Sequence, residues 1–360
     1  MTHTNESIVE NNDWLNKKLL GLKISLPAII LADHFRIRPD MQNSYSEHQI
    51  ENYQKDISWV LTFLSEAVWA GQPALFDEFI SWLKIFLSSL HVPMKDVRES
   101  LELLKNRINE ACTQEENTMI NTVFDPALEL FTTRNEKTAI PSIEIELQPM
   151  AREYLDHLLK GLRNEAMYLI MNTVSQGTPI KDIYLTIFQP VQYEIGRLWQ
   201  TNKISVAQEH YCTGATQLVM SQLYPYLFTG EKKNKKMVAT CVPGELHEIG
   251  ARMVTDFFEM EGWDTYYLGA SNPIGGVIRY IQDIQPQFVA ISATMTFHVS
   301  AVQEMVHQIK KSPGMPDNLK IMVGGYPFLV ARQLWKQVGA DAFATNALDA
   351  VNLANKMVVQ

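Results

Sequence analysis

Apolar residues in the last third of the chain form short runs that alternate with segments of helical spacing. The mostly apolar runs at 237–241, 288–291 and 319–323 have the length of buried strands. Each precedes a stretch in which apolar residues recur every three or four positions, as in 251–258. This alternation predicts a doubly wound parallel sheet over residues 237–360. We expect strands at 237–241, 265–269, 288–294, 319–323 and 342–344, and helices at 251–258, 299–310, 326–338 and 347–357.

The first 135 residues have helical periodicity only, and they predict an all-α N-terminal domain. Between Tyr53 and Ala70, for example, Ile57, Leu61 and Leu64 fall on one helix face. Gly71-Gln72-Pro73 should end that helix. Further helices are expected at 74–90, 95–111 and 118–131, and a polar, proline-containing linker at 132–149.

A second helical block, residues 150–230, predicts a four-helix bundle. Gly177-Thr178-Pro179 marks a turn, and 180–199 should form one long helix. Ser205 and Gln208 have the spacing of a capping box, which predicts the start of a last helix that reaches Leu223.

Composition narrows the class of protein. A chain with 46% hydrophobic and 20% charged residues is typical of a globular protein. A net charge of −9 argues against a nucleic-acid partner, and no apolar run approaches the length of a membrane span. Three cysteines without metal-site spacing, and an N-terminus without a signal peptide, predict a cytoplasmic protein.

The most informative stretch follows the first expected strand of the α/β domain. Glu245 and His247 lie on a loop at the carboxyl end of that strand, where open α/β sheets bind ligands. An imidazole there can coordinate a metal, while the Glu245 carboxylate holds its other nitrogen. His247 is therefore a candidate metal ligand, although a lone loop histidine is more commonly a hydrogen-bonded or solvated residue.

The downstream spacing strengthens this hypothesis. Gly250 completes an E-x-H-x-x-G pattern, Ser292-Ala293-Thr294 follows after 41 residues, and Gly324-Gly325 follows after 29 more. In these three parts the domain resembles the cobalamin (vitamin B12)-binding domain of methionine synthase, corrinoid methyl-carrier proteins, mutases and light-sensing repressors. The resemblance implies a flavodoxin-like, Rossmann-type fold. An ordinary flavodoxin-like domain with turn glycines is the alternative.

The resemblance also gives each part a role. His247 would bind cobalt from below after the cofactor's own base has swung away. Glycines 324 and 325 would leave room for the cofactor's nucleotide tail, because they have no Cβ atoms. The hydroxyl groups of Ser292 and Thr294 would form hydrogen bonds to that tail.

A second constellation lies in the bundle, where Trp199 is followed after nine residues by Glu209 and His210. Together with the E-x-H-x-x-G pattern it resembles the CarH-type light-sensing repressors, in which the bundle caps the upper face of adenosylcobalamin. The resemblance implies that Trp199 packs on the adenosyl group and that Glu209 and His210 line the same pocket. A core tryptophan beside a capped helix is the plainer alternative. One residue departs from the pattern: Gln200 replaces the histidine that binds cobalt after photolysis in those repressors.

The leading hypothesis from sequence is a non-enzymatic, adenosylcobalamin-binding light sensor. Its output would pass through a homo-oligomer or a downstream regulatory protein. A corrinoid methyl carrier of a methyltransferase system is the main alternative, and such carriers would favour Asp at position 245. A light-independent cobalamin-responsive regulator is the third class.

The aromatic residues of the N-terminal domain leave a second cofactor open. The layout of a helical domain before the bundle resembles the photocobilins, which hold biliverdin beside cobalamin. Five side chains are compatible with such a pocket and equally with an ordinary core: Trp59, Trp69, Phe76, Phe79 and Trp82.

Overall fold

The computed structural model describes residues 3–131, 146–228 and 231–358. Its contacts group the chain into two compact units. The first contains the N-terminal helices together with Met295–Ser300, and the second contains the remainder of the chain. The division into domains at 1–135, 150–230 and 237–360 stays a prediction. Most of the expected linker, 132–145, lies outside the described residues.

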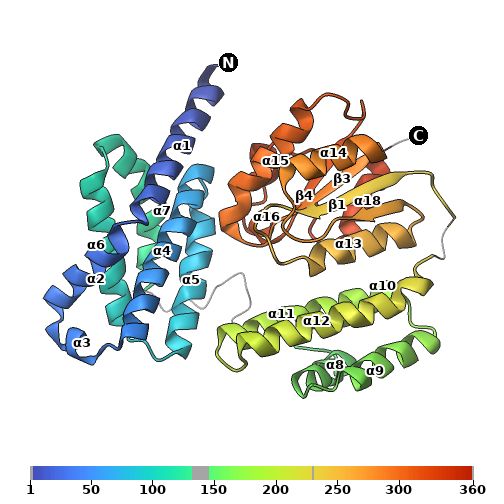
Figure 1. The fold of residues 1–360 in the computed structure, drawn as a ribbon, viewed down its shortest axis with the longest axis horizontal. Coiled ribbons are helices and arrows are strands. Elements are labelled where there is room, and N and C mark those ends of the chain that lie inside the picture. The colour runs from blue at the N-terminus through green and yellow to red at the C-terminus, as the bar shows by residue number, and fades with distance from the viewer. Residues whose placement is uncertain (1–2, 132–145, 229–230, 359–360) are drawn as a thin grey trace. The chain divides into compact units, whose positions relative to one another are not determined.

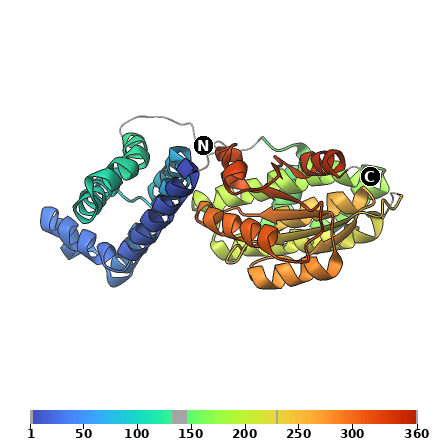
Figure 2. The same cartoon turned by 90° about the horizontal axis from the view of Figure 1, so that it is seen from above.

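The first unit is built from helices, as its periodicity predicts. The structure adds three helices before Tyr53 to the four expected ones, and it starts α4 at a capping box on Ser46. Gly71 ends α4 in the left-handed conformation, with φ 59°. Helix α1 lies along α4 (Figure 1, Figure 2), and Trp69 Nε1 donates to Asp13 at 2.6 Å. The helices are α1 His3–Leu22, α2 Leu26–Ile37, α3 Pro39–Ser44, α4 Glu47–Ala70, α5 Pro73–Ser89, α6 Met94–Ala111 and α7 Gln114–Glu129.

The helical block of the second unit follows the expected order. The capping box at Ser205 is confirmed, because Ser205 and Gln208 each bond the other's backbone N–H. The helix expected at 180–199 has nearly the right extent, but its second turn is a π-helical segment, η1. The elements are α8 Pro149–Leu159, α9 Arg163–Ser175, α10 Ile180–Ile183, η1 Tyr184–Phe188, α11 Gln189–Gln200, α12 Val206–Leu223 and the 3-10 turn η2 Tyr224–Tyr226.

The α/β part is a five-stranded parallel sheet in the order β2-β1-β3-β4-β5, which confirms the doubly wound prediction. Helices α13 and α18 pack together on one face, and α14 and α15 lie on the other (Figure 1). The elements are β1 Lys236–Cys241, α13 Ile249–Met260, β2 Asp264–Tyr267, α14 Ile274–Ile284, β3 Phe288–Ser292, η3 Thr296–His298, α15 Val299–Lys311, β4 Lys320–Gly324, α16 Tyr326–Val330, α17 Leu334–Gln337, β5 Ala342–Phe343 and α18 Ala347–Met357.

One expected helix of this domain was wrong. Residues 326–338 form two short helices, α16 and α17, because Ala331 has non-helical angles of φ −111° and ψ 82°. Its neighbours Val330 and Leu334 preserve the apolar spacing, so the pattern alone gave no sign of the break.

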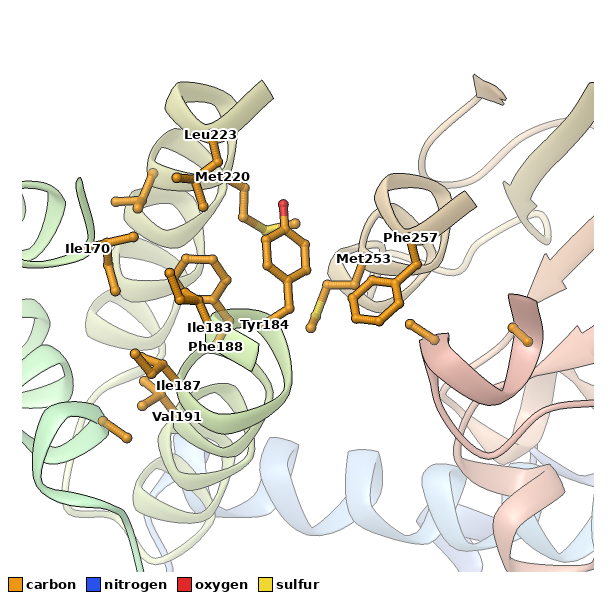
Figure 3. Close-up of a cluster of buried hydrophobic side chains, with 14 of the residues drawn as sticks. Ile170, Ile183, Tyr184, Ile187, Phe188, Val191, Met220, Leu223, Met253 and Phe257 are labelled. Atoms are coloured by element: carbon orange, nitrogen blue, oxygen red, sulfur yellow. The ribbon is translucent and has the colours of Figure 1, made fainter. Parts of the chain in front are cut away.

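A shared core joins the bundle to the α/β domain within the second unit. Tyr184 of η1 points toward Met253 and Phe257 of α13 (Figure 3). Its ring centroid lies 5.9 Å from that of Phe257. The Tyr184 hydroxyl also donates to Asp256 Oδ2 at 2.6 Å. The bundle is therefore held to α13 by both apolar and polar contacts.

Candidate functional site

Strand register brings the three parts of the sequence pattern to one edge of the sheet. Cys241 at the end of β1 pairs with Ser292 of β3, and Ser292 pairs with Gly324 of β4. The loops that follow these strands therefore leave the sheet side by side. This is the carboxyl edge, near the point where strand order reverses between β1 and β3.

Glu245 anchors the loop that carries His247. Its Oε1 lies 2.6 Å from His247 Nδ1 and accepts the His247 backbone N–H at 2.9 Å. Its Oε2 accepts the backbone N–H of Thr294, in the loop after β3, at 2.7 Å. Glu245 is fully buried. The carboxylate expected to hold the imidazole is thus in place, and it joins two of the three loops.

The His247 imidazole is held on one side and open on the other. Its side chain is 57% exposed. The hydrogen bond that His247 donates to Glu245 raises the pKa of His247 above its ordinary value, against the lowering effect of partial burial. The Glu245 and Glu209 charges raise it further. Because Nδ1 is engaged by Glu245, Nε2 is the nitrogen that can take a metal.

The three glycines of the pattern differ in what the fold demands of them. Gly325 has φ +108°, and a Cβ there would lie 1.9 Å from the Ala293 carbonyl oxygen, so the backbone itself requires glycine. A Cβ at Gly324 would meet nothing closer than 3.9 Å, and one at Gly250 nothing within 4 Å. The space beside these two is open, which fits a bulky ligand. Their cofactor-binding roles, like those of Ser292 and Thr294, stay predictions.

Glu248 is a site residue that the sequence did not single out. Its Oε2 accepts from the Ala270 N–H at 2.9 Å and the Tyr267 hydroxyl at 3.1 Å. Its Oε1 accepts from Gln217 Nε2 of α12 at 3.0 Å. Glu248 therefore joins the His247 loop to the bundle. The only feature of the sequence that could have indicated a role for Glu248 is its position next to His247.

The bundle residues of the predicted upper pocket lie around the turn between α11 and α12. Trp199 is partly buried at the end of α11. Glu209 Oε2 bonds His210 Nδ1 at 2.5 Å, and the His210 side chain is 75% exposed. The Glu209 charge contributes to the raised pKa of His247, so the start of α12 and the His247 loop influence each other electrostatically. Gln200 is buried, at 2% exposure. The roles assigned to Trp199, Glu209 and His210 stay predictions.

These residues fit a corrin cofactor. The edge offers an exposed imidazole with its far nitrogen anchored, open space beside two glycines, and a helical bundle within reach. No described helix is long and apolar enough to cross a membrane.

Comparison with known proteins identifies the class. Two family models, each described as a B12 binding domain, match residues 150–224 and 235–352. The dimethylamine corrinoid protein of Methanosarcina barkeri is 30% identical over 47% of this chain and 76% of its own length. The chain belongs to the corrinoid proteins. Dimethylamine corrinoid protein 1 of Methanosarcina mazei is 32% identical over 36% of this chain, and the match spans only 59% of that relative.

A solved structure supports the fold of this corrinoid protein. The monomethylamine corrinoid protein of Methanosarcina barkeri superimposes with a TM-score of 0.52 at 22% identity, over 57% of this chain and 97% of that one. A third family model, described as phycobilisome protein, matches residues 30–130. Cobalamin binding is thus shown for the family to which the second unit belongs.

The light-sensor hypothesis was wrong. The curated relatives are dimethylamine corrinoid proteins by name, which favours the methyl-carrier alternative. The preference for Asp over Glu at position 245 did not separate the two classes, because both side chains present the same carboxylate oxygens to a histidine. The Trp199 and Glu209-His210 spacing did not separate them either.

Proposed function

We propose that this corrinoid protein carries methyl groups in a methyltransferase system, with a methylated amine as the source, and is not itself an enzyme. The relatives' names support the class of reaction. The observation that carries the proposal is the Glu245–His247 pair on the open edge of the sheet. The partner would be a methyltransferase, in place of the regulatory protein expected from sequence.

The chain's own residues would bind and orient the cofactor. Bound cobalamin would supply a cobalt centre that accepts and releases a methyl group. His247 would hold the cobalt through Nε2, and Glu245 would keep the proton on Nδ1 and the ring in one orientation. The same carboxylate raises the pKa of His247, so it would also stabilise the protonated imidazole of a His247 that holds no metal. Gly250 and Gly324 would leave space for the cofactor.

The test is methyl transfer by the reconstituted full chain. The protein is loaded with cobalamin, reduced, and mixed with a methylamine-specific methyltransferase and its amine, and the cobalamin absorption spectrum is followed. We expect amine-dependent spectral conversion. His247→Ala should weaken cobalamin binding and shift the spectrum of the bound cofactor. Tight binding without any transfer from methylated amines would refute the carrier role and leave the cofactor assignment standing.

We propose further that the upper pocket accepts adenosylcobalamin as well as methylcobalamin. The partly buried Trp199 indole supports stacking on an adenine, and Glu209 offers acceptors for ribose hydroxyls. Titrating the protein with both forms, in wild type and Trp199→Ala, tests this. We expect Trp199→Ala to lose affinity for adenosylcobalamin only. An equal loss of affinity for both forms would contradict the stacking role of Trp199.

A bilin in the N-terminal unit is favoured by one observation, the phycobilisome-protein match over residues 30–130. A ladder of stacked aromatic rings there runs from the buried Phe63 and Phe79 to Trp82 and Phe86, which are only partly buried and would offer flat apolar surface to a tetrapyrrole. Mixing the protein with biliverdin should give a red-shifted, protein-bound absorption band. An unchanged spectrum of free biliverdin would rule this ligand out.

A further inference from the structure

We propose that the N-terminal unit binds a divalent transition-metal ion between α2 and α6, with His34, Asp96 and Glu99 as ligands. One ligand atom from each of these residues lies within 4.8 Å of the other two. The site shares no residue with the carboxyl edge of the sheet that carries His247, which we call the corrinoid edge.

The hydrogen bonds around His34 determine which of its nitrogens carries the proton. Nδ1 lies 3.0 Å from the Tyr53 hydroxyl and 3.1 Å from Ser100 Oγ. Ser100 donates its one hydrogen to the Asp96 carbonyl at 2.8 Å, so Tyr53 must donate its own to Ser100 at 2.7 Å. Neither hydroxyl has a hydrogen left for the imidazole. Nδ1 must therefore be the donor, and in the neutral ring Nε2 has the lone pair.

That lone pair faces another acceptor. Nε2 lies 3.5 Å from Glu99 Oε2, and both atoms are buried without a hydrogen-bond partner. The His34 side chain is fully buried. Two facing acceptors require either a proton or a cation between them. A separation of 3.5 Å is close to the roughly 3.4 Å between two ligand atoms that share a tetrahedral zinc ion.

The surrounding charges leave room for a cation. Arg38 Nη1 binds Asp96 Oδ1 at 2.7 Å and lies 3.7 Å from Glu99 Oε2, and Arg38 also pairs with Asp40. Lys95 lies 3.7 Å from Glu99 Oε1. The three carboxylates of Asp40, Asp96 and Glu99 thus face only two cationic side chains. One negative charge is therefore uncompensated. Arg38 occupies one Asp96 oxygen and leaves the second for a metal.

The donor set indicates the class of metal. One imidazole and two carboxylates suit zinc, manganese or ferrous iron better than calcium or magnesium, which prefer oxygen ligands alone. Tyr53 and Ser100 would orient the imidazole as outer partners do in metal sites. Since the ligands come from α2 and α6, the ion would tie these two helices together.

The experiment is a zinc titration of the full chain. All proteins carry His247→Ala, so that the corrinoid edge does not compete, and are stripped with a chelator before calorimetry with Zn²⁺ and metal analysis after dialysis. We expect one retained zinc per chain. Ser100→Ala should weaken zinc binding about 10-fold, and His34→Gln or Glu99→Gln should weaken it by more.

A matched control is available in the other unit. His157 Nε2 lies 3.7 Å from Glu153 Oε1, and this pair of a partly buried histidine and an exposed glutamate has no third ligand among the described residues, so Glu153→Gln should leave zinc binding unchanged. Glu99 is 26% exposed, which keeps Glu99→Gln informative if His34→Gln does not fold. No retained zinc, or retention that survives both Glu99→Gln and His34→Gln in folded protein, would overturn the proposal. A proton then bridges Nε2 and Glu99.

Discussion

Glu245 is the residue on which the geometry of the corrinoid edge depends. Its two oxygens accept hydrogen bonds from the ring of His247, from the His247 backbone and from the Thr294 backbone. The first two contacts could be predicted, because residues two apart on a loop are neighbours. The third, 49 residues away, depends on strand register that no local pattern gives.

Glu245→Gln should weaken cobalamin binding about 10- to 100-fold, because the amide group of glutamine places a donor where the buried carboxylate accepts. The pKa of His247 should fall toward its ordinary value, since its main raising contact is removed. Cobalamin titration and a proton-NMR titration of His247 measure the two effects. Glu304→Gln, on the exposed face of α15, is the control and should change neither. An unchanged affinity would show that Glu245 only supports the fold.

Two glycine substitutions separate folding from binding. Gly325→Ala should destabilise the protein by roughly 2 kcal/mol or more, because its Cβ would collide with the Ala293 carbonyl at a positive φ. Gly250→Ala should not lower stability, since nothing lies within 4 Å, but it should reduce cobalamin affinity if the cofactor approaches the loop there. Urea unfolding and cobalamin titration of both variants check this. If Gly250→Ala binds cobalamin as tightly as the wild type, Gly250 is not part of the cofactor site.

At the level of elements, periodicity located most helices and strands but not the irregularities within them. The helix expected at 180–199 contains η1, and no feature of its apolar spacing distinguishes a π segment from an α-helix. The polar contact at η1 joins Tyr184 to Asp256, 72 residues later. The predicted site depended on strand ends, which apolar runs mark well. The sequence did not point to Glu248 or to the cluster of His34, Asp96 and Glu99, because the partners of these residues lie on other elements.

The burial of Asp256 beneath the bundle predicts a pH dependence of stability, and its hydrogen bond from Tyr184 opposes the effect only in part. Burial raises the pKa of Asp256 to about 6, from an ordinary value of 3.8. Between these values the folded protein holds a proton that the unfolded chain releases, so the Asp256 contribution to stability is lost as pH rises from about 4 to 6. The loss is up to about 3 kcal/mol.

Asp256→Asn removes this titration while keeping an oxygen for the Tyr184 hydroxyl. The difference in unfolding free energy between wild type and Asp256→Asn should therefore change in favour of the variant as pH rises through this window. Urea unfolding at several pH values measures it, with Asp283→Asn on the exposed face of α14 as a control. A difference independent of pH would mean that Asp256 is ionised throughout.

For the whole molecule, the N-terminal helices resemble a different family from the rest of the chain. The B12-binding models match residues 150–352 in two pieces, whereas the phycobilisome model matches 30–130. One continuous apolar core runs from the bundle into the α/β domain. The bundle and the α/β domain should therefore unfold together, and the N-terminal helices separately.

Calorimetry of the full chain should accordingly show two thermal transitions, of which cobalamin raises only one. A ligand at 100 times its Kd stabilises the unit that binds it by about 2.7 kcal/mol, which corresponds to roughly 5 to 10 °C in Tm for a unit of this size. Zinc should raise the other transition, and Glu99→Gln should abolish that shift without affecting the cobalamin shift. Because each ligand binds residues of one unit only, the two shifts should be additive. A single transition that responds to both ligands would show instead that the units fold as one.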